Sequence, residues 1–119
     1  MDRRGTIRAF LLFEAATFIL AALIHAGHFF DGYAHFEAHV AETVIAIVLG
    51  SALLVSWLKP ARTRAAGLVG QGFALLGTLV GLFTIAVGVG PRTVPDVVYH
   101  IGIVLVLIWG LVVARRARS

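Results

Sequence analysis

Most of the histidines in this chain are gathered in one short polar stretch. Four of the five lie within LIHAGHFFDGYAHFEAHVAE, residues 23–42, together with three carboxylates. The fifth, His100, follows Asp96 by four residues. Imidazole and carboxylate side chains together bind zinc, iron, manganese or copper(II). The candidate ligands for a metal ion are His25, His28, His39, Glu42, Asp96 and His100, with His25, His39 and His100 expected at its centre.

The spacing of these residues suits chelation from helices. Side chains three or four positions apart lie on one face of a helix, as in the pairs His25/His28, His39/Glu42 and Asp96/His100. Thiolate and thioether ligands are not expected, because there is no cysteine and the only methionine is Met1. Three further groups could orient the ligands or pass protons: Glu14, Asp31 and His35. A metal ion held in this way could also support redox chemistry.

Two other functions of the histidines are possible from the sequence, and neither needs a metal ion chelated by histidine and carboxylate together. A b-type haem needs one histidine on each of two facing helices, which His25 or His28 could supply with His39 or His100. Gly77 and Gly81 would then leave room for the porphyrin, and the protein would exchange electrons with quinone. Alternatively, the histidines and carboxylates form a proton relay without a cofactor, extended inwards by Glu14, roughly 16 Å below His25 by helical rise.

Composition indicates which elements carry these residues. The 119 residues are 60% hydrophobic and only 13% charged, whereas about 25% is usual for soluble domains. The mean hydropathy is +0.96. A membrane span needs about 20 apolar residues. Four stretches meet this requirement, at about 7–30, 36–58, 65–89 and 94–114. We therefore expect one all-α domain, residues 1–119, that forms an integral membrane four-helix bundle with short loops.

The distribution of positive charge predicts the orientation of the bundle. Only Arg92 lies on one side of the four spans; the other side holds Arg3, Arg4, Arg8, Lys59, Arg62, Arg64, Arg115, Arg116 and Arg118. The positive-inside rule then places both termini in the cytoplasm and all five histidines near the opposite face. The bias towards Ala, Arg, Gly and Val is associated with bacterial proteins, so we expect the inner membrane. The sequence pI is about 10.7. Because the basic residues lie at the ends of the spans, topology accounts for this value and we expect no nucleic-acid binding.

One face of the third span is made of small residues. Gly70, Gly77, Gly81 and Gly88 lie within about 40° of each other on a helix, and Gly77–Gly81 is a G-x-x-x-G pair. Such a face lets another helix come close. It predicts a homo-oligomer or a larger membrane complex, besides the contact with lipid. A non-catalytic accessory subunit of such a complex is the third functional alternative.

Overall fold

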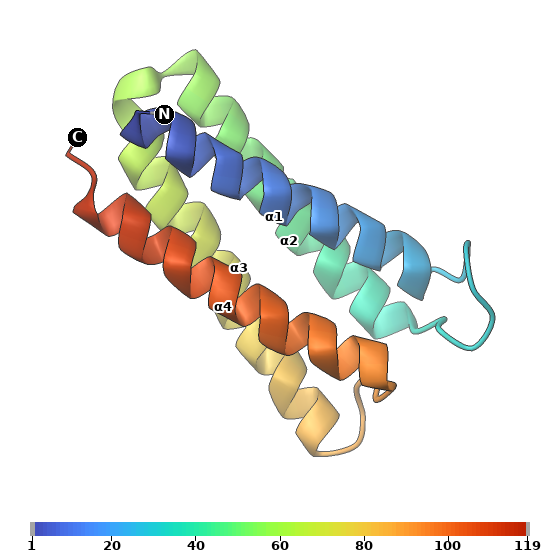
Figure 1. The fold of residues 1–119 in the computed structure, drawn as a ribbon. Helices are drawn as coiled ribbons and strands as arrows, with labels where there is room; N and C mark the ends of the chain where they lie inside the picture. The colour runs from blue at the N-terminus through green and yellow to red at the C-terminus, as the bar shows by residue number, and fades with distance from the viewer. Residues whose placement is uncertain (1, 119) are drawn as a thin grey trace.

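The protein folds into four helices, and the computed structural model describes residues 2–118 (Figure 1). The helices are α1 (Arg3–His25), α2 (Phe36–Leu58), α3 (Thr63–Ala86) and α4 (Val94–Arg116), with one 3-10 turn, η1 (Pro60–Arg62), between α2 and α3. All four are long and apolar enough to cross a membrane. The predicted all-α fold with four apolar helices is confirmed.

The helices run up and down, so that the two chain termini lie at one end of the bundle (Figure 1). Each helix packs against its neighbour in sequence, and α1 also packs against α4, which closes the bundle. We call the end with the termini and η1 the basic end. The opposite end, with the connections 26–35 and 87–93, is the histidine end. This arrangement brings segments that are far apart in sequence to the same depth.

Two helices end earlier than the apolar stretches predicted. We expected spans to residues 30 and 89, but α1 ends at His25 and α3 ends at Ala86. Gly27 and Gly88 have φ angles of +87° and +89°, in the left-handed region that commonly terminates helices. The chain after His25 turns back at once, and the backbone N–H of His35 donates to the His25 carbonyl oxygen at 2.8 Å. Apolar composition alone overestimated both spans.

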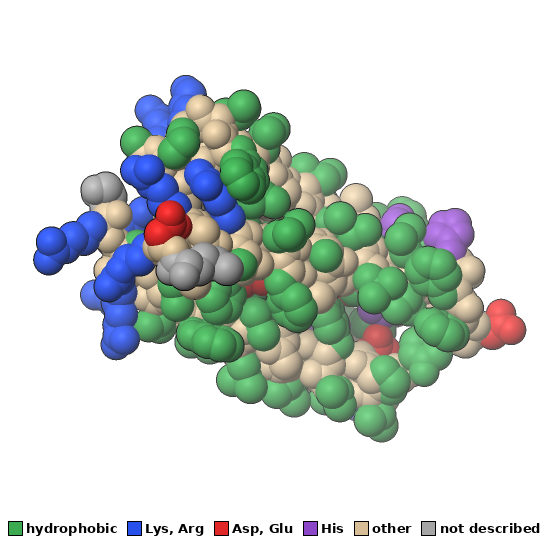
Figure 2. All heavy atoms as spheres, turned by 45° about the horizontal axis from the view of Figure 1, so that its top comes forward, with side chains coloured by type: hydrophobic (Ala, Val, Ile, Leu, Met, Phe, Trp, Pro, Cys, Tyr) green, Lys and Arg blue, Asp and Glu red, His purple; other side chains and the backbone are tan. Residues whose placement is uncertain are grey.

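The bundle is apolar on the outside as well as in its centre. Leu11, Leu49 and Leu107 are fully buried where the helices meet. Large apolar side chains such as Leu12, Ile47 and many others are more than half exposed. Hydrophobic side chains dominate the middle of the surface, and Lys and Arg side chains gather at the basic end (Figure 2). A surface of this kind suits lipid contact, since a soluble bundle would carry polar residues there.

The glycine face of α3 packs inside the chain. A Cβ atom at Gly70 would lie 2.8 Å from the Ala52 Cβ of α2, and one at Gly77 would lie 2.9 Å from Ile45 Cδ1. A Cβ atom at Gly81 would lie 3.2 Å from His100 Nε2 of α4. These glycines therefore let α3 approach α2 and α4 closely. Oligomer formation through the glycine face stays a prediction.

Candidate functional site

A histidine held between two carboxylates lies inside the histidine end of the bundle. His25 Nδ1 is 2.5 Å from Glu42 Oε1, and His25 Nε2 is 2.8 Å from Asp96 Oδ1. The three side chains come from α1, α2 and α4 and are 4%, 5% and 6% exposed. We call them the triad. The structure thus brings together three of the six candidate ligands, although Asp96 lies 71 residues from His25 in sequence.

With one hydrogen in each of its two contacts, the triad carries one net negative charge, whichever partner holds each hydrogen. The two contacts can both be hydrogen bonds only when each of them contains one hydrogen. An imidazolium between two carboxylates and an imidazole between a carboxylate and a carboxylic acid both sum to −1. Buried charge is costly unless it is paired and hydrogen-bonded. The two hydrogen bonds of His25 satisfy most of this need, but one carboxylate oxygen of the triad is left without a hydrogen bond among the described residues.

That remaining oxygen is Glu42 Oε2. Within residues 2–118 it is buried and has no hydrogen-bond partner. The Asp96 carboxylate, in contrast, uses its second oxygen at the start of α4, where Oδ2 accepts from the Thr93 backbone N–H at 3.1 Å and from the Thr93 hydroxyl. This capping box fixes Asp96 in place. Glu42 is therefore the member of the triad that has acceptor capacity left.

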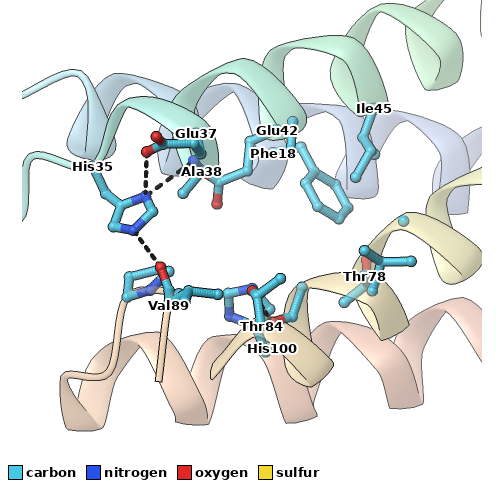
Figure 3. Close-up of a pocket in the computed structure, with 16 residues that line it drawn as sticks. Phe18, His35, Glu37, Ala38, Glu42, Ile45, Thr78, Thr84, Val89 and His100 are labelled. Atoms are coloured by element: carbon cyan, nitrogen blue, oxygen red, sulfur yellow. Dashed lines mark hydrogen bonds and ion pairs between the residues drawn. The ribbon is translucent and has the colours of Figure 1, made fainter. Parts of the chain in front are cut away.

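A cavity of about 400 Å³ lies beside Glu42, between α2, α3 and α4 (Figure 3). Figure 3 shows the carboxylate end of Glu42 pointing into it, across from His100. Much of the wall is apolar, with Phe18 and Ile45 at the inner side. At the open side, His35 Nε2 donates to the carbonyl oxygen of Val89 at 3.2 Å. The cavity is thus mainly apolar, with a few polar groups that converge on it.

The imidazole of His100 forms part of the opposite wall. Its Nδ1 lies 2.7 Å from the backbone carbonyl oxygen of Asp96, one helical turn earlier. A carbonyl oxygen only accepts, so Nδ1 carries the hydrogen and Nε2 of the neutral ring is an acceptor. Nε2 makes no hydrogen bond to the described residues and lies against Gly81. His100 therefore does not join the triad, although it lines the same cavity as Glu42.

The other candidate residues lie apart from the triad. His39 Nδ1 donates to the Ala22 carbonyl oxygen at 2.9 Å and so braces α2 against α1. His35 caps α2, since its Nδ1 accepts the Ala38 backbone N–H. His28 and Asp31 are exposed in the connection between α1 and α2. Their solvated positions agree with a loop role.

Glu14 lies deeper in the bundle, within α1. It is fully buried, and among the described residues neither of its carboxyl oxygens has a hydrogen-bond partner. It lines neither the cavity beside Glu42 nor a second cavity, of about 380 Å³, that borders His25 and Asp96 between α1 and α4. No hydrogen bond within residues 2–118 links it to the triad.

The metal-ion and haem predictions receive no support from this arrangement. Within residues 2–118 no group of three or more His, Cys, Asp or Glu residues is placed to hold a metal ion. Both ring nitrogens of His25 already face carboxylates. Gly77 and Gly81, expected beside a porphyrin, face Ile45 and His100. Both cofactors stay predictions.

Sequence reasoning missed most of the cavity wall. Phe18, Thr78 and Thr84 line it, but an aromatic or hydroxyl residue within an apolar helix gives no signal of its own in the sequence. Gly77 and Gly81 were the available hint, since small residues leave space next to a helix. Comparisons of the chain with known protein families, with curated proteins and with solved structures found no match.

Proposed function

We propose that this chain is a multi-pass membrane protein that binds a small, largely apolar molecule in the cavity beside Glu42. The observation that carries the proposal is the Glu42 side chain, which lines a cavity of about 400 Å³ and has one buried carboxylate oxygen without a hydrogen-bond partner among the described residues. Ligand pockets typically measure about 300–1,000 Å³ and combine apolar walls with a few placed polar groups. A buried acceptor without a partner also costs free energy, which a bound donor would recover.

The triad has a positioning role in this proposal. Its two hydrogen bonds tie Glu42 to α1 and α4, so the carboxylate is held at the cavity wall by three helices. Preorganised polar groups lose little conformational entropy when a ligand binds. The triad also gives this wall its negative charge. Binding is the activity that these features support, and they identify no reacting bond.

The cavity can be tested by filling it. Ala41 is exposed at the cavity rim on α2, so Ala41→Trp should occupy the space without disturbing the core. Val40→Trp, next to it but outside the cavity, is the matched control. Organic extracts of the three purified proteins would be compared by mass spectrometry. We expect a small molecule in the wild type and in Val40→Trp that is lost from Ala41→Trp. Identical extracts from all three would contradict the proposal.

We also propose that the basic end faces the cytoplasm of a bacterial inner membrane. Arg3 and Arg64 contact backbone oxygens of Arg116 and Arg115, which supports a basic cluster at this end. The positive-inside rule assigns such an end to the cytoplasm. The histidine end and its cavity would then open towards the outer face.

Single-cysteine labelling tests this orientation, because the chain has no cysteine of its own. Asp31→Cys lies at the histidine end and Ala61→Cys at the basic end, and both positions are exposed. A membrane-impermeant maleimide should label Asp31→Cys in intact cells and Ala61→Cys only after permeabilisation. The reverse pattern would show that the orientation is wrong. Equal labelling of both in intact cells would contradict a single orientation.

A further inference from the structure

The hydrogen-bonding state of the cavity wall restricts what it can bind. Among the side chains that line it, the groups able to donate are His35, His100, Thr78 and Thr84. His35 Nε2 donates to the Val89 carbonyl, and His100 Nδ1 donates to the Asp96 carbonyl. The Thr78 and Thr84 hydroxyls donate to the carbonyl oxygens of Ala74 and Gly81 in their own helix. Every side-chain donor of the wall is therefore already used.

Two acceptor atoms of the lining side chains, in contrast, receive no hydrogen bond from the described residues. Glu42 Oε2 has no partner among the described residues, and His100 Nε2 carries a lone pair that makes no hydrogen bond to them. The side chains that carry these atoms come from α2 and α4 and line the cavity from opposite sides (Figure 3). A molecule that only accepts hydrogen bonds would leave both of them unpaired. The wall therefore selects a ligand that donates.

Charge narrows the class of ligand further. The triad joins two carboxylates to one imidazole beside the cavity, and no Lys or Arg side chain among the described residues lines it. Glu37 lies at the rim, but its side chain is 83% exposed, so solvent screens its charge and it contributes little to this selection. A hydrogen bond between a cationic donor and a carboxylate is roughly twice as strong as one between neutral groups. The apolar walls, with the Phe18 ring among them, suit the body of the ligand and disfavour a small hydrated ion.

We infer that the cavity beside Glu42 takes an organic ammonium ion, a molecule with an apolar body and a protonated amine whose N–H groups donate to the Glu42 carboxylate and to His100 Nε2. This inference rests on the proposed function and specifies its ligand class. It assigns Glu42 as the residue that determines specificity. His25 and Asp96 act through Glu42, because they hold its other oxygen and share its charge.

Three probes of similar shape test the ligand class: phenethylamine in its ammonium form, phenethyltrimethylammonium and 2-phenylethanol. Their affinities for the wild-type protein in detergent at pH 7 would be measured by isothermal titration calorimetry. The ammonium probe should bind at least about tenfold more tightly than the alcohol, as expected for a charge-assisted hydrogen bond. It should also bind more tightly than the trimethylammonium probe, which has the charge but no N–H to donate.

Glu42→Gln keeps the side-chain shape and removes the carboxylate. It should weaken binding of the ammonium probe by about tenfold or more and change the affinity for the alcohol by less than about twofold. Unchanged alcohol binding also shows that the variant is folded. Glu37→Gln, on the same helix at the exposed rim, is the matched control and should leave all three affinities within about twofold, because exposed charges contribute little.

The outcomes separate this inference from the proposed function. If the alcohol binds as tightly as the ammonium probe, or if Glu42→Gln retains the wild-type affinity for the ammonium probe, the ligand class is wrong. Sensitivity of that binding to Ala41→Trp would still support the cavity as a binding site. If no probe binds the wild type and the extracts of the cavity variants are identical, both the ligand class and the proposed function are wrong.

Discussion

Replacing His25 with leucine is expected to lower the free energy of unfolding by about 3–5 kcal/mol, the usual cost of removing one partner from a buried ion pair. The variant would leave Glu42 and Asp96 buried, with no group between them to share a proton. Leucine has no donor for either carboxylate. Unfolding in mixed micelles with increasing sodium dodecyl sulfate, followed by circular dichroism, measures the change.

Two further variants show whether the loss comes from the triad. His28→Leu removes an exposed imidazole from the neighbouring connection and should change stability by less than about 0.5 kcal/mol. Adding Glu42→Leu to His25→Leu should recover part of the loss, because one of the two stranded carboxylates is gone while Asp96 keeps its contacts with Thr93. A double variant less stable than His25→Leu alone would rule out the triad as the cause.

Replacing Gly110 with alanine is expected to cost about 1–3 kcal/mol of stability, the typical penalty for overpacking. A Cβ atom at this buried position on α4 would overlap Gln71 Oε1 on α3 and lie 3.0 Å from Phe10 Cδ1 on α1. Gln71 is fully buried, and its Nε2 donates to the Gly67 carbonyl oxygen at 3.0 Å. Because Oε1 and Nε2 belong to one planar amide, moving Oε1 away also displaces Nε2 and weakens that hydrogen bond.

Gly102 provides a matched control on the same helix. A Cβ atom there would meet nothing within 4 Å, so Gly102→Ala should be neutral or slightly stabilising through its better helix propensity. Combining Gly110→Ala with Gln71→Ala should remove the overlap and restore part of the stability. The same denaturation experiment measures all four proteins. Equal stability of Gly110→Ala and Gly102→Ala would show that α3 and α4 are not packed as closely as described.

The sequence alone determined the helical architecture of this protein, because the causes are local. The length of the apolar runs predicted four helices, and α2 has the expected bounds at Phe36–Leu58. Proline and acidic residues at the start of α4 agree with its capping box. The error at the end of α1 is also local: an apolar run does not reveal that Gly27 adopts a positive φ. That conformation moved His28 from the expected helix face into a loop.

The sequence determined less about the site. Helical spacing placed His25, Glu42 and Asp96 among six candidate ligands, but it put His25 together with His39 and His100 at the centre of the site. The tertiary structure decided that His25 pairs with both carboxylates, that His100 bonds to its own helix and that His39 bonds to the α1 backbone. These choices depend on how each helix is rotated about its axis. Packing sets that rotation through contacts such as Gly70 with Ala52 and Gly77 with Ile45, which join separate helices. Periodicity within one helix carries no information about a partner on another, so only the folded bundle determines which polar atoms are paired and which face the cavity.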